Sequence, residues 1–84
     1  MISLEKIKIT AEQLRGGRAM VRISAQELAD RAGVGVATVR RSEAETGEIS
    51  ATFSNSNAMK TALEAAGVEF IPENGGGAGV RLRK

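Results

Sequence analysis

The sequence predicts a mainly α-helical domain, a bundle of four to five helices that ends in a short β-hairpin. Two observations predict this fold class. Residues 24–43 have the pattern of two short helices joined by a turn that contains two glycines. Residues 68–83 contain two short apolar stretches on either side of a glycine-rich segment, which is typical of a hairpin. At 84 residues the chain has the length of a single domain.

The composition argues against several classes of function. The chain has no cysteine and no histidine, which removes the commonest zinc ligands and histidine-dependent acid–base chemistry. We therefore expect no enzyme, no metal site and no cofactor. The net charge of +2 and the pI near 9.5 are compatible with nucleic-acid binding, and equally with an ordinary surface.

The expected location is the cytoplasm. No apolar run approaches the ~20 residues that a membrane-spanning helix needs, so no membrane partner is expected. The N-terminus lacks the long apolar core and cleavage site of a secretion signal. A chain of this length has no room for a ligand-sensing domain, so we expect no small-molecule ligand.

Residues 1–9 form the first segment, and the sequence leaves two possibilities open for it. It is either an N-terminal arm or an edge strand, because Ile7 and Ile9 alternate with lysine as strand residues do.

The first helix is predicted from Ala11 to about Arg22. Thr10 precedes Ala11 and has capping-box spacing to the glutamine three residues later. Gly16 and Gly17 lie in the middle, where each glycine costs on the order of 1 kcal/mol relative to alanine. We expect these glycines to let the following helix pair pack closely against this helix.

The next two helices surround the turn. Ser24 and Glu27 have capping-box spacing and start one helix. Gly33 suits a helix end, because glycine adopts positive φ without penalty. Gly35 can then cap a second helix over residues 36–43.

A loop and a further helix follow. The serine, threonine and asparagine cluster after residue 43 predicts the loop, with Ile49 and Phe53 as its anchors in the core. Asn55 or Ser56 is expected to cap a helix over residues 58–66, where apolar residues recur at helical spacing.

The C-terminal hairpin is predicted from strands at residues 68–71 and 80–83, with Glu69 facing a basic residue of the other strand. Its glycine-rich loop lacks the Gly-Lys-Ser/Thr ending of a phosphate-binding loop, so we interpret it as a hairpin turn. A lone hairpin is marginal in water. We expect residues 68–84 to form the dimer interface, with residues 7–9 as the candidate for a further edge strand; the alternative is a hairpin folded onto its own helices.

The pattern between residues 10 and 47 resembles the Cro/CI-type (XRE-like) helix-turn-helix domains that bind DNA. The matching residues are Leu14, Arg15, Arg18, Ile23, Ser24, Glu27, Leu28, Ala29, Ala32, Gly33, Val34, Thr38, Val39, Arg41 and Glu43. The resemblance implies a four- to five-helix DNA-binding domain over residues 10–67, with residues 36–43 in the major groove. It also implies a homodimer on a two-fold operator and an ion pair between Arg18 and Glu43.

The second helix of the pair carries the candidate DNA-reading residues. Its expected exposed face holds the base-contact candidates Val36, Ala37, Arg40 and Arg41, and Arg41 is the best candidate for guanine. The candidates for DNA-backbone contact are Arg15, Arg22, Ser24, Gln26, Thr38 and Lys60, and, if the tail forms the dimer, Arg81 and Arg83. Ala25 departs from the family pattern, which often has glutamine there.

We predict a transcriptional regulator that binds a two-fold operator of double-stranded DNA as a homodimer and represses or activates promoters, its own promoter being one candidate. The alternative is a protein-interaction module of the same fold, an antitoxin or an antiactivator. The apolar pair Val36 and Ala37 and the alanine at position 25 favour that alternative slightly.

Overall fold

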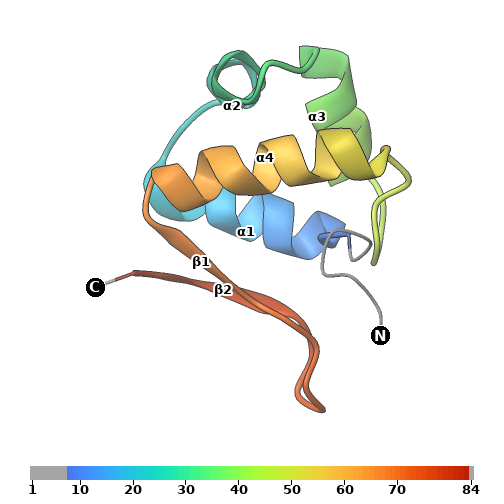
Figure 1. Cartoon of the computed structure of the whole chain (residues 1–84), viewed down its shortest axis with the longest axis vertical. Coiled ribbons are helices and arrows are strands. Elements are labelled where there is room, and N and C mark those ends of the chain that lie inside the picture. The colour runs from blue at the N-terminus through green and yellow to red at the C-terminus, as the bar shows by residue number, and fades with distance from the viewer. Residues whose placement is uncertain (1–7, 84) are drawn as a thin grey trace.

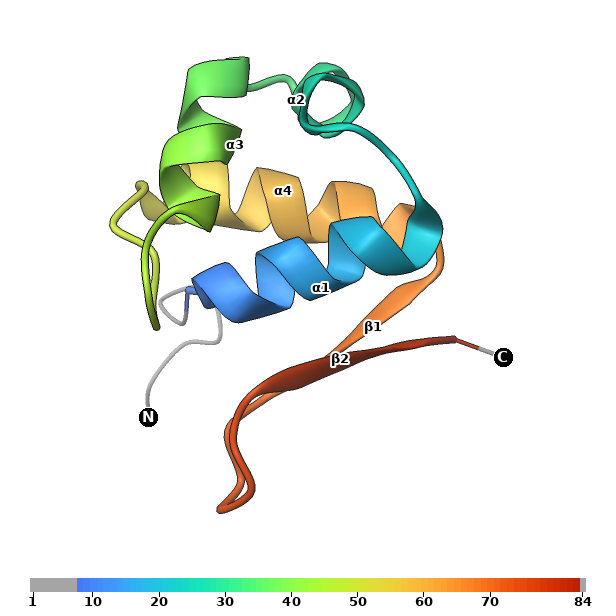
Figure 2. The same ribbon diagram turned by 180° about the vertical axis from the view of Figure 1, so that it is seen from behind.

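The computed structural model describes residues 8–83, in which four helices precede a two-stranded antiparallel sheet. The elements are α1 (Ala11–Val21), α2 (Ala25–Ala32), α3 (Val36–Glu43), α4 (Phe53–Ala65), β1 (Val68–Ile71) and β2 (Gly79–Leu82). Helices α1 and α4 lie side by side, with α2 and α3 on one side of them and the hairpin on the other (Figure 1 and Figure 2). The mainly helical fold with a C-terminal hairpin is confirmed, and residues 8–83 contain four helices rather than five.

The caps of the first two helices explain where these helices begin. The Thr10 hydroxyl accepts a hydrogen bond from the Gln13 backbone N–H at 3.0 Å, and the Gln13 side-chain oxygen accepts one from the Thr10 N–H at 2.9 Å. This capping box is confirmed. The second one is only half formed: the Ser24 hydroxyl accepts from the Glu27 N–H at 3.0 Å, while the Glu27 carboxylate pairs with Arg31.

The start of α4 differs from the prediction. The helix begins at Phe53 and is capped by Thr52, whose hydroxyl accepts from the Asn55 N–H at 3.1 Å. The serine and asparagine run has low helix propensity, but its Ser56 is buried and accepts a hydrogen bond from the Ile9 N–H. Tertiary contact therefore extends the helix into a stretch that reads as a loop.

Only one of the two predicted loop anchors enters the core. Ile49 is 1% exposed, as predicted. Phe53 is 43% exposed, so its prediction as an anchor is wrong. Its ring instead lies under the ammonium of Lys8, which is 4.8 Å from the ring centroid, a cation–π arrangement.

The close approach at the glycines of α1 is confirmed, but its partners are α4 and the hairpin rather than α2 and α3. A Cβ at Gly17 would lie 3.2 Å from Leu63 of α4, and one at Gly16 would lie 3.2 Å from Val80 of β2. Val68 of β1 is fully buried and belongs to the same core as the helices. The hairpin is therefore packed against its own bundle on one face.

The hairpin has the predicted partners. Glu69 is opposite Arg81, and Arg81 Nε lies 2.9 Å from a Glu69 carboxylate oxygen. β2 begins one residue earlier than predicted. The buried Gln13 side chain donates to the Ile71 and Gly79 carbonyls, both at 3.1 Å. These hydrogen bonds hold the loop end of the two strands against α1.

The glycine-rich tip behaves as a turn. The Glu73 carboxylate accepts hydrogen bonds from the N–H groups of Gly75 and Gly77, at 2.9 and 3.1 Å. Amides that could cradle an anion are thus bound by a carboxylate of the chain itself.

The predicted N-terminal arm or strand lies largely outside the described residues. At its end, Thr10 forms an isolated bridge with Glu48, and the Ile49 N–H donates to the Ile9 carbonyl. This pairing joins the segment to the loop before α4. None of the helices within residues 8–83 is long and apolar enough to cross a membrane.

Candidate nucleic-acid interface

Helix α3 presents a narrow exposed face on the side of the molecule opposite the hairpin (Figure 1). Val39 is fully buried and fixes the inner face, while Ala37, Arg40 and Arg41 are exposed, as predicted. Val36 is half-buried and packs against the core. The prediction that Val36 belongs to the exposed face is therefore wrong, since the first turn of α3 tilts that side chain toward the bundle.

An ion pair holds α3 against α1. Arg18 Nε and Nη2 donate to the two carboxylate oxygens of Glu43 at 2.7 and 2.8 Å, and Nη1 donates to the Ile23 carbonyl at 3.0 Å. The side chains are 28% and 12% exposed. The hydrogen bonds that the Arg18 guanidinium donates to the Glu43 carboxylate raise the pKa of Arg18. The pair that the family resemblance implies is present, and Arg18 thereby joins α1 to α3 and to the turn before α2.

Arg15 is also committed to α3. Its guanidinium donates to the Glu43 carbonyl and, at 3.2 Å, to the Glu45 carbonyl, and lies 3.5 Å from the Glu12 carboxylate. Carbonyls at a helix C-terminus lack partners within the helix, and a cation there is favourable. Arg15 thus caps α3, an arrangement that the sequence analysis missed.

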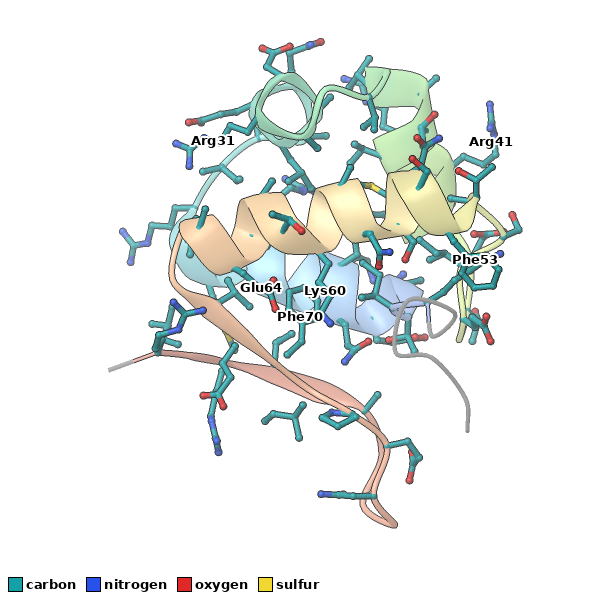
Figure 3. All side chains as sticks on the ribbon, in the orientation of Figure 1. Arg31, Arg41, Phe53, Lys60, Glu64 and Phe70 are labelled. Atoms are coloured by element: carbon teal, nitrogen blue, oxygen red, sulfur yellow. The ribbon has the colours of Figure 1, made fainter. Side chains whose placement is uncertain are left out.

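The exposed arginines of α3 differ from these two. Within residues 8–83, no carboxylate oxygen lies within 4.0 Å of the Arg40 or Arg41 guanidinium groups. Figure 3 shows Arg41 extending outward from α3, far from Arg31 at the other end of the α2 and α3 side. Among the described residues these two cationic groups therefore form no salt bridge, and Arg41 acts on Glu45 only through the longer-range effect of its charge.

A polar hollow of about 210 Å³ adjoins this face, between α3 and the start of α4. Its lining consists of Thr38, Arg41, Ser42, Ser50, Ala51, Thr52 and Asn55. The N-terminus of a 13-residue helix opens here, where free N–H groups and the helix dipole favour an anion. Hydroxyl groups, an arginine and a helix start thus surround one small space.

Glu45 shapes the loop that forms one wall of the hollow. Its carboxylate accepts from the Ser50 hydroxyl at 2.6 Å and from the Ser50 N–H at 3.0 Å. These hydrogen bonds, and secondarily the charge of Arg41, lower the pKa of Glu45. The loop therefore keeps its shape best when Glu45 is ionised.

The other predicted backbone-contact residues are distributed over two sides. Ser24 caps α2, Gln26 donates to Asp30 at 2.9 Å, and Arg22 is exposed where α1 ends. Lys60 lies on the hairpin side, with its ammonium 6.0 Å from the Phe70 ring centroid.

The hairpin lies on the side of the bundle opposite α2 and α3 (Figure 1), and Arg81 and Arg83 belong to its second strand and the residue after it. They do not share a surface with Arg40 and Arg41 in one copy of the chain.

A larger hollow of about 320 Å³ lies under the hairpin, between it and the helices, and is lined by both apolar and charged residues. It is separate from the α3 face. The chain matches no protein-family model, and no curated protein is a significant match to it. The assignment of the α3 face thus depends on the residues and their geometry.

Proposed function

We propose that this protein is a sequence-specific DNA-binding transcriptional regulator of the Cro/CI (XRE-like) type, with α3 in the major groove of double-stranded DNA. The observation that carries the proposal is the contrast in α3 itself. Its inner face is fixed by Val39 and by the Arg18–Glu43 pair, while no carboxylate of the described part of the chain lies within 4.0 Å of the Arg40 or Arg41 guanidinium groups. Arginines on a rigid, exposed helix suit recognition of guanine and phosphate.

The geometry suggests separate roles for the two arginines. Arg41 borders the polar hollow at the start of α4, which is suited to a backbone phosphate. We therefore propose Arg41 as a phosphate contact and Arg40 as the guanine reader, whereas the sequence analysis made Arg41 the best candidate for guanine. Ala37 can contact a thymine methyl group, which is apolar and lies in the major groove.

Residues at the edges of α2 and α3 complete the proposed contact surface. Ser24, Gln26 and Thr38, with Arg22 at the end of α1, are the candidates for contact with flanking phosphates. The regulator is proposed to act as a homodimer in the cytoplasm and to change transcription by occupying promoter DNA. In this proposal the protein has no catalytic activity and needs no cofactor.

A salt titration tests the proposal. The full chain is titrated with a duplex that contains its own upstream region, and in parallel with a duplex of the same length and composition in scrambled order. We expect tighter binding to the first duplex and an affinity that falls steeply as salt rises.

Two results together would contradict the proposal. The first is equal, weak affinity for both duplexes, and the second is the failure of selection from a random duplex pool to yield a preferred sequence. Together they would favour the protein-interaction alternative, an antitoxin or an antiactivator, whose structural support is reduced to the exposed apolar Ala37 because Val36 packs against the core.

A further inference from the structure

The C-terminal half of β2 is much more exposed than the start of β1. β1 starts at the fully buried Val68, whereas Arg81 and Leu82 of β2 are exposed, Leu82 by 54%. The Arg83 N–H donates to the Gly67 carbonyl at 2.7 Å, so this pair is hydrogen-bonded. Because such pairs alternate along an antiparallel ladder, Val80 and Leu82 direct their N–H and C=O groups away from β1, toward an edge that no other strand of residues 8–83 covers.

Exposed apolar side chains gather beside this edge. α1 and β2 run in the same direction, because Gln13 contacts Gly79 and Gly16 contacts Val80. Met20 lies one helical turn beyond Gly16, about 6 Å along α1, and Leu82 lies two residues beyond Val80, about 6.6 Å along β2. Both therefore reach the same end of the bundle, and Met20 is 39% exposed.

We propose that this edge binds a second copy of the chain through antiparallel pairing of β2 with β2, centred on Arg81. In this register Val80 of each copy is hydrogen-bonded to Leu82 of the other, which satisfies the free groups of both edges. The proposal specifies the interface of the homodimer proposed above and does not depend on DNA being the ligand.

The register is self-consistent on the inner face of the shared sheet. Val68 is opposite Leu82, and Phe70 is opposite Val80. Pairing Leu82 with Val80 of the second copy therefore joins two apolar rows across four strands, and Leu82 becomes covered. Cross-strand apolar neighbours of this kind stabilise sheets.

The outer face places Arg81 beside Arg81 of the second copy. Each guanidinium already donates to its own Glu69 carboxylate, at 2.9 and 3.1 Å. Across the four strands the charged residues therefore follow the order Glu69, Arg81, Arg81 and Glu69, and each arginine lies beside the glutamate of its own copy. Like charges across strands would otherwise be unfavourable.

The symmetry of such a sheet also suits the proposed function. Antiparallel neighbours are related by a two-fold axis perpendicular to the sheet, so both bundles lie on the same face of it. Because α2 and α3 lie beyond α1 and α4 from the hairpin (Figure 2), both α3 faces point to the same side. A two-fold operator requires that arrangement.

Cysteine crosslinking tests the register, because the chain has no cysteine of its own. Residues directly opposite in a non-hydrogen-bonded pair have Cα atoms about 4.5 Å apart, within disulfide reach. Under mild oxidation we expect Arg81→Cys to form a covalent dimer. Arg83→Cys is the matched control. Position 83 lies two residues from the two-fold axis at Arg81, so the thiols of the two copies are four residues, roughly 13 Å, apart along the strands.

Light scattering of the full chain at micromolar concentration tests the interface. We expect twice the chain mass of 8.8 kDa for the wild type and a single chain mass for Leu82→Glu. Phe53→Glu, which alters another exposed apolar residue at the start of α4, should stay dimeric. A monomeric wild type, a dimeric Leu82→Glu variant, or crosslinking through position 83 but not 81 would overturn the proposal. None of these results bears on binding of a half-site by α3, which the salt titration measures.

Discussion

The arginines of α1 and those of α3 differ in what holds them. Arg15 and Arg18 are turned onto the end of α3, where carboxylate and carbonyl oxygens of the protein bind them. Arg40 and Arg41 have no carboxylate within 4.0 Å in the described part of the chain. Residue type alone therefore does not determine what these arginines do. An arginine that is bound by oxygens of the protein stabilises the fold, whereas an arginine without such a partner remains available to a ligand.

The largest expected effect is on the stability of the fold, through the partner of Arg18. Glu43→Ala leaves the partly buried Arg18 without its carboxylate. Breaking a buried pair from one side costs about 3–5 kcal/mol, and the partial exposure places this one near the lower limit. A loss of about 3 kcal/mol should lower the Tm of a domain of this size by more than ~10 °C.

Circular dichroism during heating measures this shift. The matched control is Glu27→Ala, which breaks the exposed pair with Arg31 on α2 and should cost no more than about 0.5 kcal/mol. Equal Tm values for the two variants would show that the Arg18–Glu43 pair adds nothing beyond a surface contact.

The next effect concerns the two arginines of α3. Arg40→Ala and Arg41→Ala should each weaken specific DNA binding by about 1–3 kcal/mol without changing Tm. If Arg41 contacts phosphate, its loss weakens all duplexes alike and reduces the slope of log affinity against log salt by about 1. Arg40→Ala should keep that slope and relax the preference at one base pair. Exchange of the two behaviours would restore the assignment expected from sequence.

Arg15→Ala tests whether an arginine of α1 stabilises the fold or contacts DNA. Loss of the cation at the α3 C-terminus should reduce stability by about 0.3–1 kcal/mol, measured by urea denaturation. The salt slope of DNA binding should not change. A reduced slope would mean that Arg15 contacts the DNA backbone, as the sequence analysis predicted.

The smallest effect is on pH dependence. The pKa of Glu45 is lowered by its hydrogen bonds with Ser50, so the folded state favours the ionised carboxylate. This contribution is complete above the ordinary carboxyl pKa of about 4.5 and is lost as the pH falls through the lower folded-state value. Ser50→Ala should therefore reduce the loss of stability on acidification, measured as Tm against pH. An identical acid profile in this variant would exclude the loop as a contributor.

The sequence predicted those features that depend on local chemistry. The helix caps at Thr10 and Ser24, the turn at Gly33 and the pairing of Glu69 with Arg81 follow from short-range rules, and the structure contains them. The exposed face of α3 was predicted from helical spacing, except at Val36.

Features that depend on tertiary contact were not predicted. The early start of α4 depends on burial of Ser56, and the cover over the hairpin depends on Gly16, Gly17 and Gln13. The capping role of Arg15 requires α1 to lie beside the end of α3. Local propensity contains no information about these distant neighbours.

The most direct test of the central claim compares two double variants that each remove two positive charges. Arg40→Ala/Arg41→Ala changes the α3 face, and Lys60→Ala/Arg83→Ala changes residues on the hairpin side. Affinity for the preferred duplex is measured at one fixed salt concentration. We predict that the first variant binds at least about 30-fold more weakly, as expected for two contacts of at least about 1 kcal/mol each, and that the second stays close to the wild type. Equal losses in both variants would show that binding follows net charge rather than the α3 face, and would contradict the account.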